Sequence, residues 1–234
     1  MNTAPTVTVL IHGGQVGAWV WDAVRTQLNS PSVAVDLPGH GGRGGSLKGL
    51  RVSQCVDAVL NEIPSSGRII LVGHSLGGAV ALAVASRISD RIARLVLIAA
   101  MVPNSGEPMI SSFPFGMRLI SNIVLRLMPE FAERPAAIKK NLNGMSPAAV
   151  EAAAARFSKE SSSLILDRVD WNLDSQVPVT YVRCLRDLGP LSPAYQEQLA
   201  ARLPGADVIA IDACHYAMLE KPTEVASLIN GIAP

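Results

Sequence analysis

The chain has 234 residues, which is enough for one α/β domain with a substantial buried core. Hydrophobic residues make up 49% of the sequence and charged residues 17%, which excludes an intrinsically disordered chain. The formal net charge is +1, and no basic block or acidic tail occurs. A nucleic-acid partner or an acidic membrane partner therefore has no electrostatic signal in the sequence.

Cysteine usage and the start of the chain predict a cytoplasmic protein. The cysteines Cys55, Cys184 and Cys214 are odd in number and lack metal-like spacing, which favours reduced thiols over disulfides. Residues 1–5 show no charged segment and no signal-peptide core, and no apolar run is long enough to span a membrane. We expect neither a secretory signal nor a membrane span.

Strands and helices alternate through residues 1–101, which predicts an α/β fold with a mostly parallel sheet and helices on both faces. The predicted strands of this part are residues 6–11, 32–35, 68–72 and 94–99. The predicted helices are residues 18–28, 52–63 and 76–88. The same alternation resumes after residue 171, with strands at 177–184 and 207–211 and helices at 193–203 and 222–232.

Residues 102–171 have no clear strand pattern and predict a helical insertion on the sheet. The helix-like segments are residues 115–127, 147–157 and 162–169. Ser146 is a favourable N-cap, and Pro147 suits the first helical position. We therefore expect a core formed by residues 1–101 and 172–234, covered by a helical cap at residues 102–171.

The sharpest motif is Gly73-His74-Ser75-Leu76-Gly77, between a predicted apolar strand and a predicted helix. When a nucleophile lies on such a tight turn, the residues two positions before and after it are packed closely together. A Cβ atom would not fit at these positions, which explains the two glycines. The turn would expose the Ser75 hydroxyl at the carboxyl edge of the sheet. We predict that Ser75 is a nucleophile rather than an incidental serine in a glycine-rich turn.

A serine nucleophile needs a base, and in this architecture the expected chain order is serine, acid, histidine. His215 follows Ser75 and lies in a loop after a predicted strand, so it is the predicted base. Asp187 lies in the loop after the preceding strand and is the predicted acid that orients His215. The alternatives for the acid are Asp212, Asp170 and Asp174.

The loop after the first predicted strand supplies the second part of a predicted oxyanion hole. His12-Gly13-Gly14 ends that strand, and a glycine-rich loop there can present a backbone N–H to a developing oxyanion. We predict the N–H groups of Gly14 and of Leu76, at the start of a helix, as the two donors. His12, like His40 and His74, is interpreted as a structural histidine.

Several of these segments together resemble one branch of the α/β-hydrolases, the methylesterases and hydroxynitrile lyases, which include plant methyl salicylate esterases. The segments are residues 13–19, 36–41, 73–78, 181–187 and 215–219. The resemblance implies an α/β-hydrolase fold, a triad of Ser75, Asp187 and His215, oxyanion donors at Gly14 and Leu76, and a cap over the pocket.

The chain departs from the lyase members of that branch at two positions, and from many members of the whole branch at a third. The lyase members typically have Thr at the position of Gly13 and Lys at the position of Tyr216, and many members have Asp at the position of Cys214. The lysine would stabilise departing cyanide, and here it is replaced by tyrosine. The departures favour an esterase over a lyase.

These patterns predict hydrolysis of a small, largely apolar carboxylic ester through an acyl-enzyme on Ser75, without a metal or organic cofactor. The candidate substrate-binding residues are Gly13, Trp19, Trp171 and Tyr216. Further apolar cap residues that either line the pocket or pack cap on core are Phe113, Phe115, Met117 and Met128. Two alternatives stay open on the same scaffold, a hydroxynitrile-type lyase and a slow-turnover ligand sensor.

Overall fold

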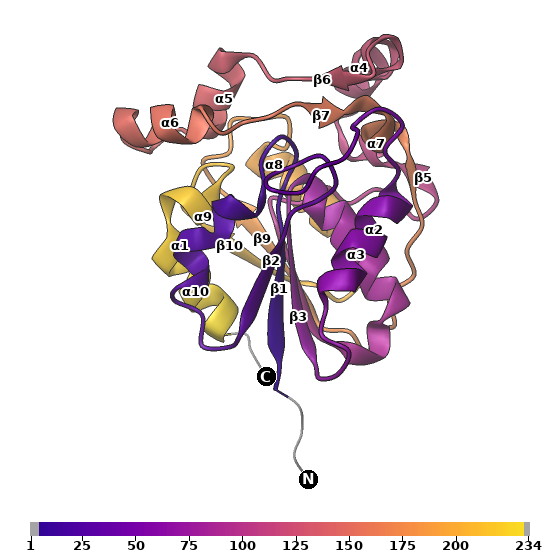
Figure 1. The fold of residues 1–234 in the computed structure, drawn as a ribbon, viewed down its shortest axis with the longest axis vertical. Helices are drawn as coiled ribbons and strands as arrows, with labels where there is room; N and C mark the ends of the chain where they lie inside the picture. Colours follow the sequence, from indigo (N-terminus) through magenta and orange to yellow (C-terminus); the bar gives the residue numbers. More distant parts are fainter. Residues whose placement is uncertain (1–4, 232–234) are drawn as a thin grey trace.

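The computed structural model describes residues 5–231, and its centre is a parallel sheet of six strands in the order β10-β9-β4-β3-β1-β2 (Figure 1). The strands are β1 (Val7–Ile11), β2 (Ser32–Val35), β3 (Ile69–His74), β4 (Ile92–Ile98), β9 (Val179–Cys184) and β10 (Asp207–Ile211). The predicted α/β class and parallel sheet are confirmed, and each predicted strand overlaps an observed one. The residues at 1–4 and 232–234, including the end of the last predicted helix, lie outside the described part.

The central strands are buried along their whole length because both faces of the sheet are covered. In β1, Val9 and Ile11 contribute to one hydrophobic core, and Leu10, between them, contributes to the other. Successive side chains of a strand point to opposite faces, so a strand covered on both sides has to be apolar throughout. This explains why β1 and β3 read as continuous apolar runs.

The helices of the core cover the two faces of the sheet (Figure 1). One group packs on the core that contains Val9, and it comprises α2 (Val52–Glu62), α3 (Leu76–Arg87) and α8 (Pro193–Ala200). The other group comprises α1 (Asp22–Arg25), α9 (Ala217–Glu220) and α10 (Pro222–Gly231). Helix α3 is buried from Leu76 to Ala85, since its small apolar side chains lie between the sheet and α2.

The predicted helix at residues 18–28 is shorter than expected. It consists of a 3-10 turn (Ala18–Trp21) followed by the single-turn helix α1. At its end, the Thr26 hydroxyl and the Gln27 side-chain amide both donate to the carbonyl of Ala23, at 3.0 and 2.9 Å. These side chains occupy an acceptor that the backbone would need in order to continue the helix.

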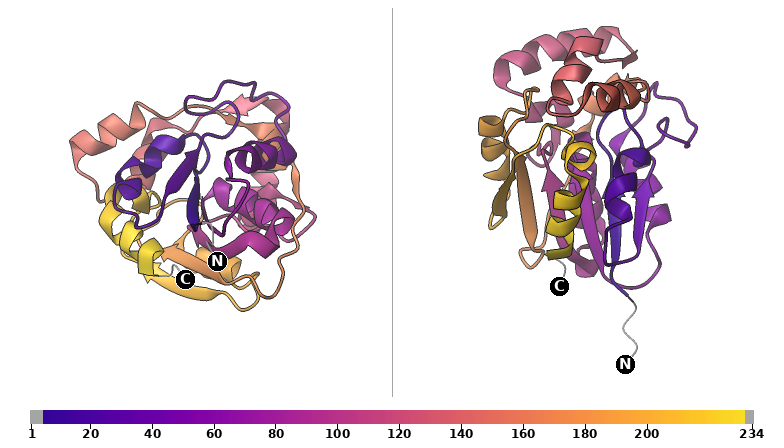
Figure 2. Two further views of the ribbon diagram at one scale, coloured as in Figure 1. Left: turned by 60° about the horizontal axis from the view of Figure 1, so that its bottom comes forward. Right: turned by 90° about the vertical axis from the view of Figure 1, so that its left-hand side faces the viewer.

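Residues 102–171 lie over the carboxyl ends of the strands (Figure 1), and Figure 2 shows the same layer from the side. The helices of this region are α4 (Phe115–Leu127), α5 (Pro135–Asn141), α6 (Pro147–Ala154) and α7 (Ser162–Leu166). Two small antiparallel pairs tie it together, β5 (Glu107–Pro108) with β8 (Arg168–Val169), and β6 (Glu130–Phe131) with β7 (Glu160–Ser161).

The sequence predicted three of these helices, although α6 and α7 end earlier than expected, but missed α5 and the four short strands. A strand of two residues leaves no alternating pattern to detect. The Ser146 cap is confirmed, since its Oγ accepts from the N–H of Ala149 at 3.3 Å. No helix within residues 5–231 combines the length and apolarity needed to cross a membrane.

A substitution at Gly77 tests how closely α3 packs against the end of β1. A Cβ atom added at Gly77 would lie 2.2 Å from the carbonyl oxygen of His12, a backbone atom with little room to move. We expect Gly77→Ala to lower the free energy of unfolding by about 1–3 kcal/mol through overpacking, measured by urea denaturation.

Gly116→Ala, in the first turn of α4, is the matched control. A Cβ atom there meets nothing within 4 Å, so the change should leave stability equal or raise it by up to about 1 kcal/mol. Equal losses of stability in both variants would contradict the close packing of α3.

Candidate active site

Ser75 lies on the sharp turn between β3 and α3, with backbone angles φ 50° and ψ −122°. Its N–H donates to the carbonyl of Ile98 at the end of β4, at 3.1 Å. Its carbonyl accepts from the N–H groups of Gly78, at 3.0 Å, and Met101, at 2.9 Å. Left-handed backbone is unfavourable for a residue with a Cβ atom, so these three hydrogen bonds hold the turn in place.

The glycines around the nucleophile are required by close contacts, as the sequence predicts. A Cβ atom at Gly73 would lie 2.7 Å from the carbonyl oxygen of Gly77. One at Gly13 would lie 2.7 Å from Nδ1 of His74 and 3.0 Å from Cβ of Ser75. Gly13 therefore lies against the back of the turn, where it leaves room for the serine.

His215 connects Ser75 to a buried carboxylate. Its Nε2 lies 3.1 Å from the Ser75 Oγ, and its Nδ1 lies 2.5 Å from Oδ2 of Asp187. Asp187 follows the end of β9, and His215 lies in the loop after β10, so two neighbouring parallel strands bring the pair together. A base between a hydroxyl and a carboxylate is the arrangement that activates a serine nucleophile.

Asp187 is held by contacts that the sequence did not reveal. The side-chain amide of Gln196 on α8 donates to Oδ2 at 2.9 Å, and the N–H of Gly189 donates to Oδ1 at 2.7 Å. Gln196 is itself fixed, because its Oε1 accepts from the N–H of Cys184 at 2.8 Å. These donors satisfy the hydrogen-bonding capacity of the buried carboxylate and fix its orientation.

The charge of Asp187 governs the protonation of His215. Burial lowers the pKa of His215, but the charge and hydrogen bond of Asp187, together with the charge of Glu133, outweigh burial. The pKa of His215 therefore lies above its ordinary value of 6.5. The imidazole is accordingly a stronger base than it would be without the carboxylate.

The other acids considered from the sequence lie elsewhere. Asp212 pairs with Arg186 at 3.0 Å, and its side chain is 72% exposed. Asp174 accepts from the N–H of Gln176 at 2.9 Å, and Asp170 borders a surface depression beside α2. Of these four acids, Asp187 is the one that the structure places against His215.

Two further histidines have structural contacts. Burial lowers the pKa of His12 to about 4, so its ring is neutral. Its Nδ1 donates to the carbonyl of Gly13, and its Nε2 accepts from the N–H of Leu37. Burial also lowers the pKa of His74 well below its ordinary value, and its Nε2 donates to the carbonyl of His215 at 2.9 Å. His74 thus supports the loop that carries the base.

A cavity of about 100 Å³ opens beside Ser75 and His215, and both predicted oxyanion donors, Gly14 and Leu76, line it. Leu76 is the first residue of α3, where backbone N–H groups lack partners inside the helix. Apolar side chains form much of the remaining wall: Met101, Phe113, Phe131, Ile165 and Leu191. The polar side chains of the wall come from Gln15, Glu133, Asn141 and Glu160.

Of the four candidate substrate-binding residues, two lie at the nucleophile or its cavity and two lie elsewhere. Tyr216 lines the cavity, and Gly13 lies behind the nucleophile. Trp19 instead stacks under the guanidinium of Arg156, at 4.1 Å from its ring centroid, and borders a different depression. Trp171 donates from its ring nitrogen to the carbonyl of Pro103 and borders another depression at the far edge of α8.

The remaining apolar cap residues divide in the same way. Phe113 lines the cavity, whereas Phe115, Met117 and Met128 are at least 40% exposed on or beside α4.

Among residues 5–231, no group of three or more His, Cys, Asp or Glu side chains is placed to hold a metal ion.

Comparisons with known proteins agree with this architecture. A model of the alpha/beta hydrolase family matches residues 8–228. The pimeloyl-(acyl-carrier protein) methyl ester esterase of Aromatoleum aromaticum is 31% identical, over 96% of each chain. Methylesterase 7 of Arabidopsis thaliana is 28% identical, over 96% of this chain and 95% of its own.

Solved structures show the same fold. An extracellular alpha/beta-hydrolase from a Paenibacillus species, described as a homologue of tobacco salicylic acid binding protein 2, superposes with a TM-score of 0.86. Its identity is 22%, and the match covers 98% of this chain and 99% of the other.

The acid that acts on His215 can be identified by titration. Asp187→Asn removes the neighbouring negative charge, so we expect the pKa of His215 to fall, followed by NMR of the imidazole ring. Asp212→Asn is the matched control, because its exposed carboxylate pairs with Arg186 instead. An equal shift in both variants, or in neither, would contradict the assignment.

Proposed function

The chain belongs to the alpha/beta hydrolase family and is a carboxylic ester hydrolase, and we propose that it acts through an acyl-enzyme on Ser75. The observation that carries this proposal is that His215 contacts Asp187 at 2.5 Å and Ser75 at 3.1 Å, and that Ser75 and His215 line a cavity. The curated relatives named above are esterases, which supports ester hydrolysis as the reaction.

In the first half of the proposed reaction, the Ser75 oxygen attacks the ester carbonyl while Nε2 of His215 takes its proton. The carbonyl oxygen becomes negatively charged and accepts hydrogen bonds from the N–H groups of Gly14 and Leu76. Asp187 stabilises the imidazolium and keeps Nδ1 protonated. His215 then gives its proton to the leaving alcohol, and the acyl group stays on Ser75.

In the second half, water enters where the alcohol left. His215 takes a proton from the water, and the resulting hydroxide attacks the acyl carbonyl. The same two N–H groups bind the oxyanion again. Collapse of the tetrahedral intermediate releases the carboxylic acid, and His215 returns the proton to Ser75. Every step uses protein groups and water alone.

We propose a small, largely apolar ester as the substrate. The cavity is small, and Met101, Phe113 and Leu191 are among its apolar walls. Relatives named as methyl ester esterases and methylesterases support a short alcohol as the leaving group. The polar wall residue Glu133 is acidic, which disfavours a substrate with a second negative charge near the reacting carbonyl.

A lyase or a ligand sensor on this scaffold has less support. The residue after His215 is Tyr216, and among the described residues that line the cavity there is no Lys or Arg to stabilise a leaving anion. A sensor has no need of a base aligned with a nucleophile, whereas Ser75 and His215 are in contact. Hydrolysis is therefore the function that the geometry supports best.

We also propose a cytoplasmic location and a small-molecule substrate as the partner. Cys55, Cys184 and Cys214 are buried and unpaired, which suits a reducing compartment. Burial raises the pKa of Cys214 to about 12, so this thiol beside His215 is uncharged. The N-terminal part of the signal-peptide prediction, residues 1–4, lies outside the described residues.

Ester hydrolysis by wild type and Ser75→Ala tests the mechanism. With p-nitrophenyl acetate, butyrate and octanoate, we expect wild-type turnover that is fastest on the short acyl chains, because the cavity is small. Ser75→Ala should lower kcat at least about 10⁴-fold, since the nucleophile is lost. Ser53→Ala, at an exposed position of α2, is the control and should keep wild-type kcat.

Equal kcat for wild type and Ser75→Ala would refute the acyl-enzyme. Cyanide release from a cyanohydrin without ester turnover would instead favour the lyase.

The pH dependence of kcat/KM should report His215. The base acts in its neutral form, so activity falls as the pH drops through the pKa of His215. Because Asp187 raises that pKa, we expect the midpoint to lie above 6.5. Stopped assays on p-nitrophenyl butyrate across pH 5–9 measure the midpoint, and a midpoint well below 6.5 would contradict the coupling to Asp187.

A further inference from the structure

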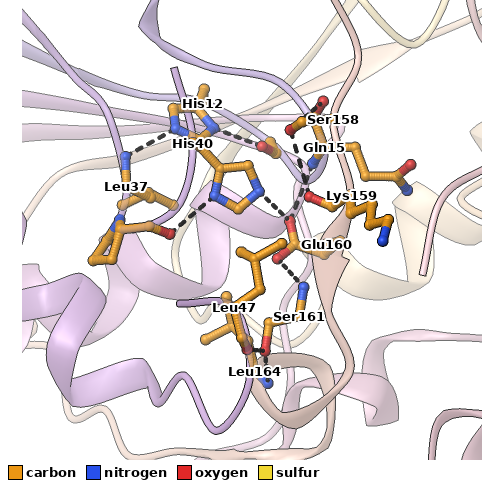
Figure 3. Close-up of polar contacts among 12 residues, drawn as sticks. His12, Gln15, Leu37, His40, Leu47, Ser158, Lys159, Glu160, Ser161 and Leu164 are labelled. Carbon is orange, nitrogen blue, oxygen red and sulfur yellow. Dashed lines mark hydrogen bonds and ion pairs between the residues drawn. The ribbon is translucent and has the colours of Figure 1, made fainter. Parts of the chain in front are cut away.

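A buried carboxylate from β7 reaches from the cap into the core (Figure 3). Glu160 is 1% exposed, and it lines the cavity beside Ser75. Its Oε1 accepts from the N–H of Ser161 at 2.7 Å, and its Oε2 accepts from the N–H of Gln15 at 3.1 Å. The same Oε2 lies 3.2 Å from Nε2 of His40. Burying a charge is costly unless it is paired, so this arrangement calls for an explanation.

Gln15 directly follows the proposed oxyanion donor Gly14, and the cap holds it at three points. Its N–H donates to Glu160, its carbonyl accepts from the N–H of Ser158 at 2.8 Å, and its Oε1 accepts from the N–H of Glu133 at 2.7 Å. Its φ is 63°, a left-handed conformation that costs a residue with a side chain free energy. These contacts fix the peptide between Gly14 and Gln15 and with it the backbone of Gly14.

The position of the Glu160 carboxylate also raises an electrostatic problem. A Cβ atom at Gly14 would lie 3.1 Å from its Oε2, so the carboxylate borders the place where an oxyanion would form. Two negative charges close together repel each other strongly where water is excluded. An unpaired carboxylate here would oppose the reaction that Gly14 assists.

His40 is placed to cancel that charge. Its Nδ1 lies 3.1 Å from the carbonyl oxygen of Pro38, and its Nε2 faces Glu160 (Figure 3). Both ring nitrogens thus meet acceptors, which favours the doubly protonated ring. Burial lowers the pKa of His40, but the charged carboxylate of Glu160, 3.2 Å from Nε2, outweighs burial and raises it. The neighbouring His12 ring, 5.4 Å away, is neutral and adds no competing charge.

We propose that Glu160 and His40 are positioning residues for the oxyanion hole. Glu160 holds the Gly14–Gln15 peptide so that the Gly14 N–H points into the cavity, and His40 neutralises Glu160 so that the cavity accepts a new negative charge. This inference rests on the proposed function, because it gives the pair a role in the same ester hydrolysis.

The neighbouring Ser161 provides a matched control for simple attachment of the cap to the core. Its Oγ donates to the carbonyl of Leu47 at 2.6 Å and accepts from the N–H of Leu164 at 3.3 Å. Ser161→Ala therefore loosens β7 one residue away from Glu160 without removing a side-chain contact to Gln15.

The test compares Glu160→Ala, Glu160→Gln, His40→Gln, the double variant H40Q/E160Q and Ser161→Ala. Active sites are counted by labelling with a fluorophosphonate, and kcat and KM are measured on p-nitrophenyl butyrate. We expect Glu160→Ala to lower kcat per active site at least about 10-fold with KM changed less than about twofold, since an oxyanion donor acts in the transition state. Ser161→Ala should lower the melting temperature and keep kcat within about twofold.

The His40 variants separate the effect of the Glu160 charge from the effect of altered packing. His40→Gln leaves Glu160 unpaired beside the oxyanion, so it should lower kcat more than Glu160→Gln does. The double variant places two neutral amides there and should regain at least about threefold in kcat over His40→Gln alone, as coupled neighbours do. If His40 and Glu160 had a purely structural role, the double variant would instead lose more kcat than either single variant.

Three results would overturn the inference. One is a rise in KM with kcat unchanged in Glu160→Ala, which would make Glu160 a substrate contact. Another is a loss of kcat in Ser161→Ala equal to that in Glu160→Ala. The third is a double variant slower than His40→Gln.

A second measurement keeps the inference separate from the proposed function. If wild type hydrolyses no ester, the proposed function fails. Amide hydrogen exchange still measures whether Glu160 stabilises the Gly14–Gln15 peptide. In a Ser75→Ala background, we expect the Gln15 N–H to exchange at least about 10-fold faster in Glu160→Ala than with Glu160 present. Unchanged exchange would show that Glu160 does not hold this peptide.

Discussion

The turn at Ser75 is the constraint on which the rest of the site depends. A residue with a side chain is held in left-handed backbone, and its N–H and carbonyl are fixed by the end of β4 and by the first turn of α3. The strain requires a rigid frame, which the buried strands and the largely buried α3 provide. The same turn places the Leu76 N–H at a helix start, so one bend supplies both a hydroxyl and a hydrogen-bond donor to the cavity.

Left-handed backbone recurs after the strands of the sheet. Among residues 5–231, the non-glycine residues with positive φ are Gln15, Ser75 and Ala99. Each follows the carboxyl end of a strand, where the sheet stops and the chain has to change direction. The core holds Ser75 through backbone hydrogen bonds, whereas the cap holds Gln15 through Ser158, among others. The cavity is therefore shaped by both parts of the chain, and neither part alone determines it.

The sequence predicted the groups that follow a local rule. Ser75 lies in a motif with strict spacing, and His215 and Asp187 follow the ends of consecutive strands of the sheet. Contacts made by side chains from other elements leave no such trace. Gln196 reaches Asp187 from the middle of α8, and Glu160 reaches Gln15 across 145 positions of sequence. Only the folded arrangement reveals these partners.

Apolar character alone was a poor guide to the cavity wall. Trp19 and Trp171 are candidate substrate-binding residues in the sequence, but each borders a separate depression. Phe113 and Tyr216 do line the cavity. The difference lies in where the fold brings each side chain, which the type of residue does not reveal.

The cap has a consequence for how the gene can change. It is inserted between β4 and β9, which are direct neighbours in the sheet, with Leu95 opposite Val179. The two ends of the insertion are thus attached at fixed points, one after the carboxyl end of β4 and one before the amino end of β9. Closing a flexible loop costs only about 0.6 kcal/mol more for each doubling of its length. Changes in the length of the loops between the cap helices can therefore reshape the cavity while the pairing of β4 with β9 stays the same.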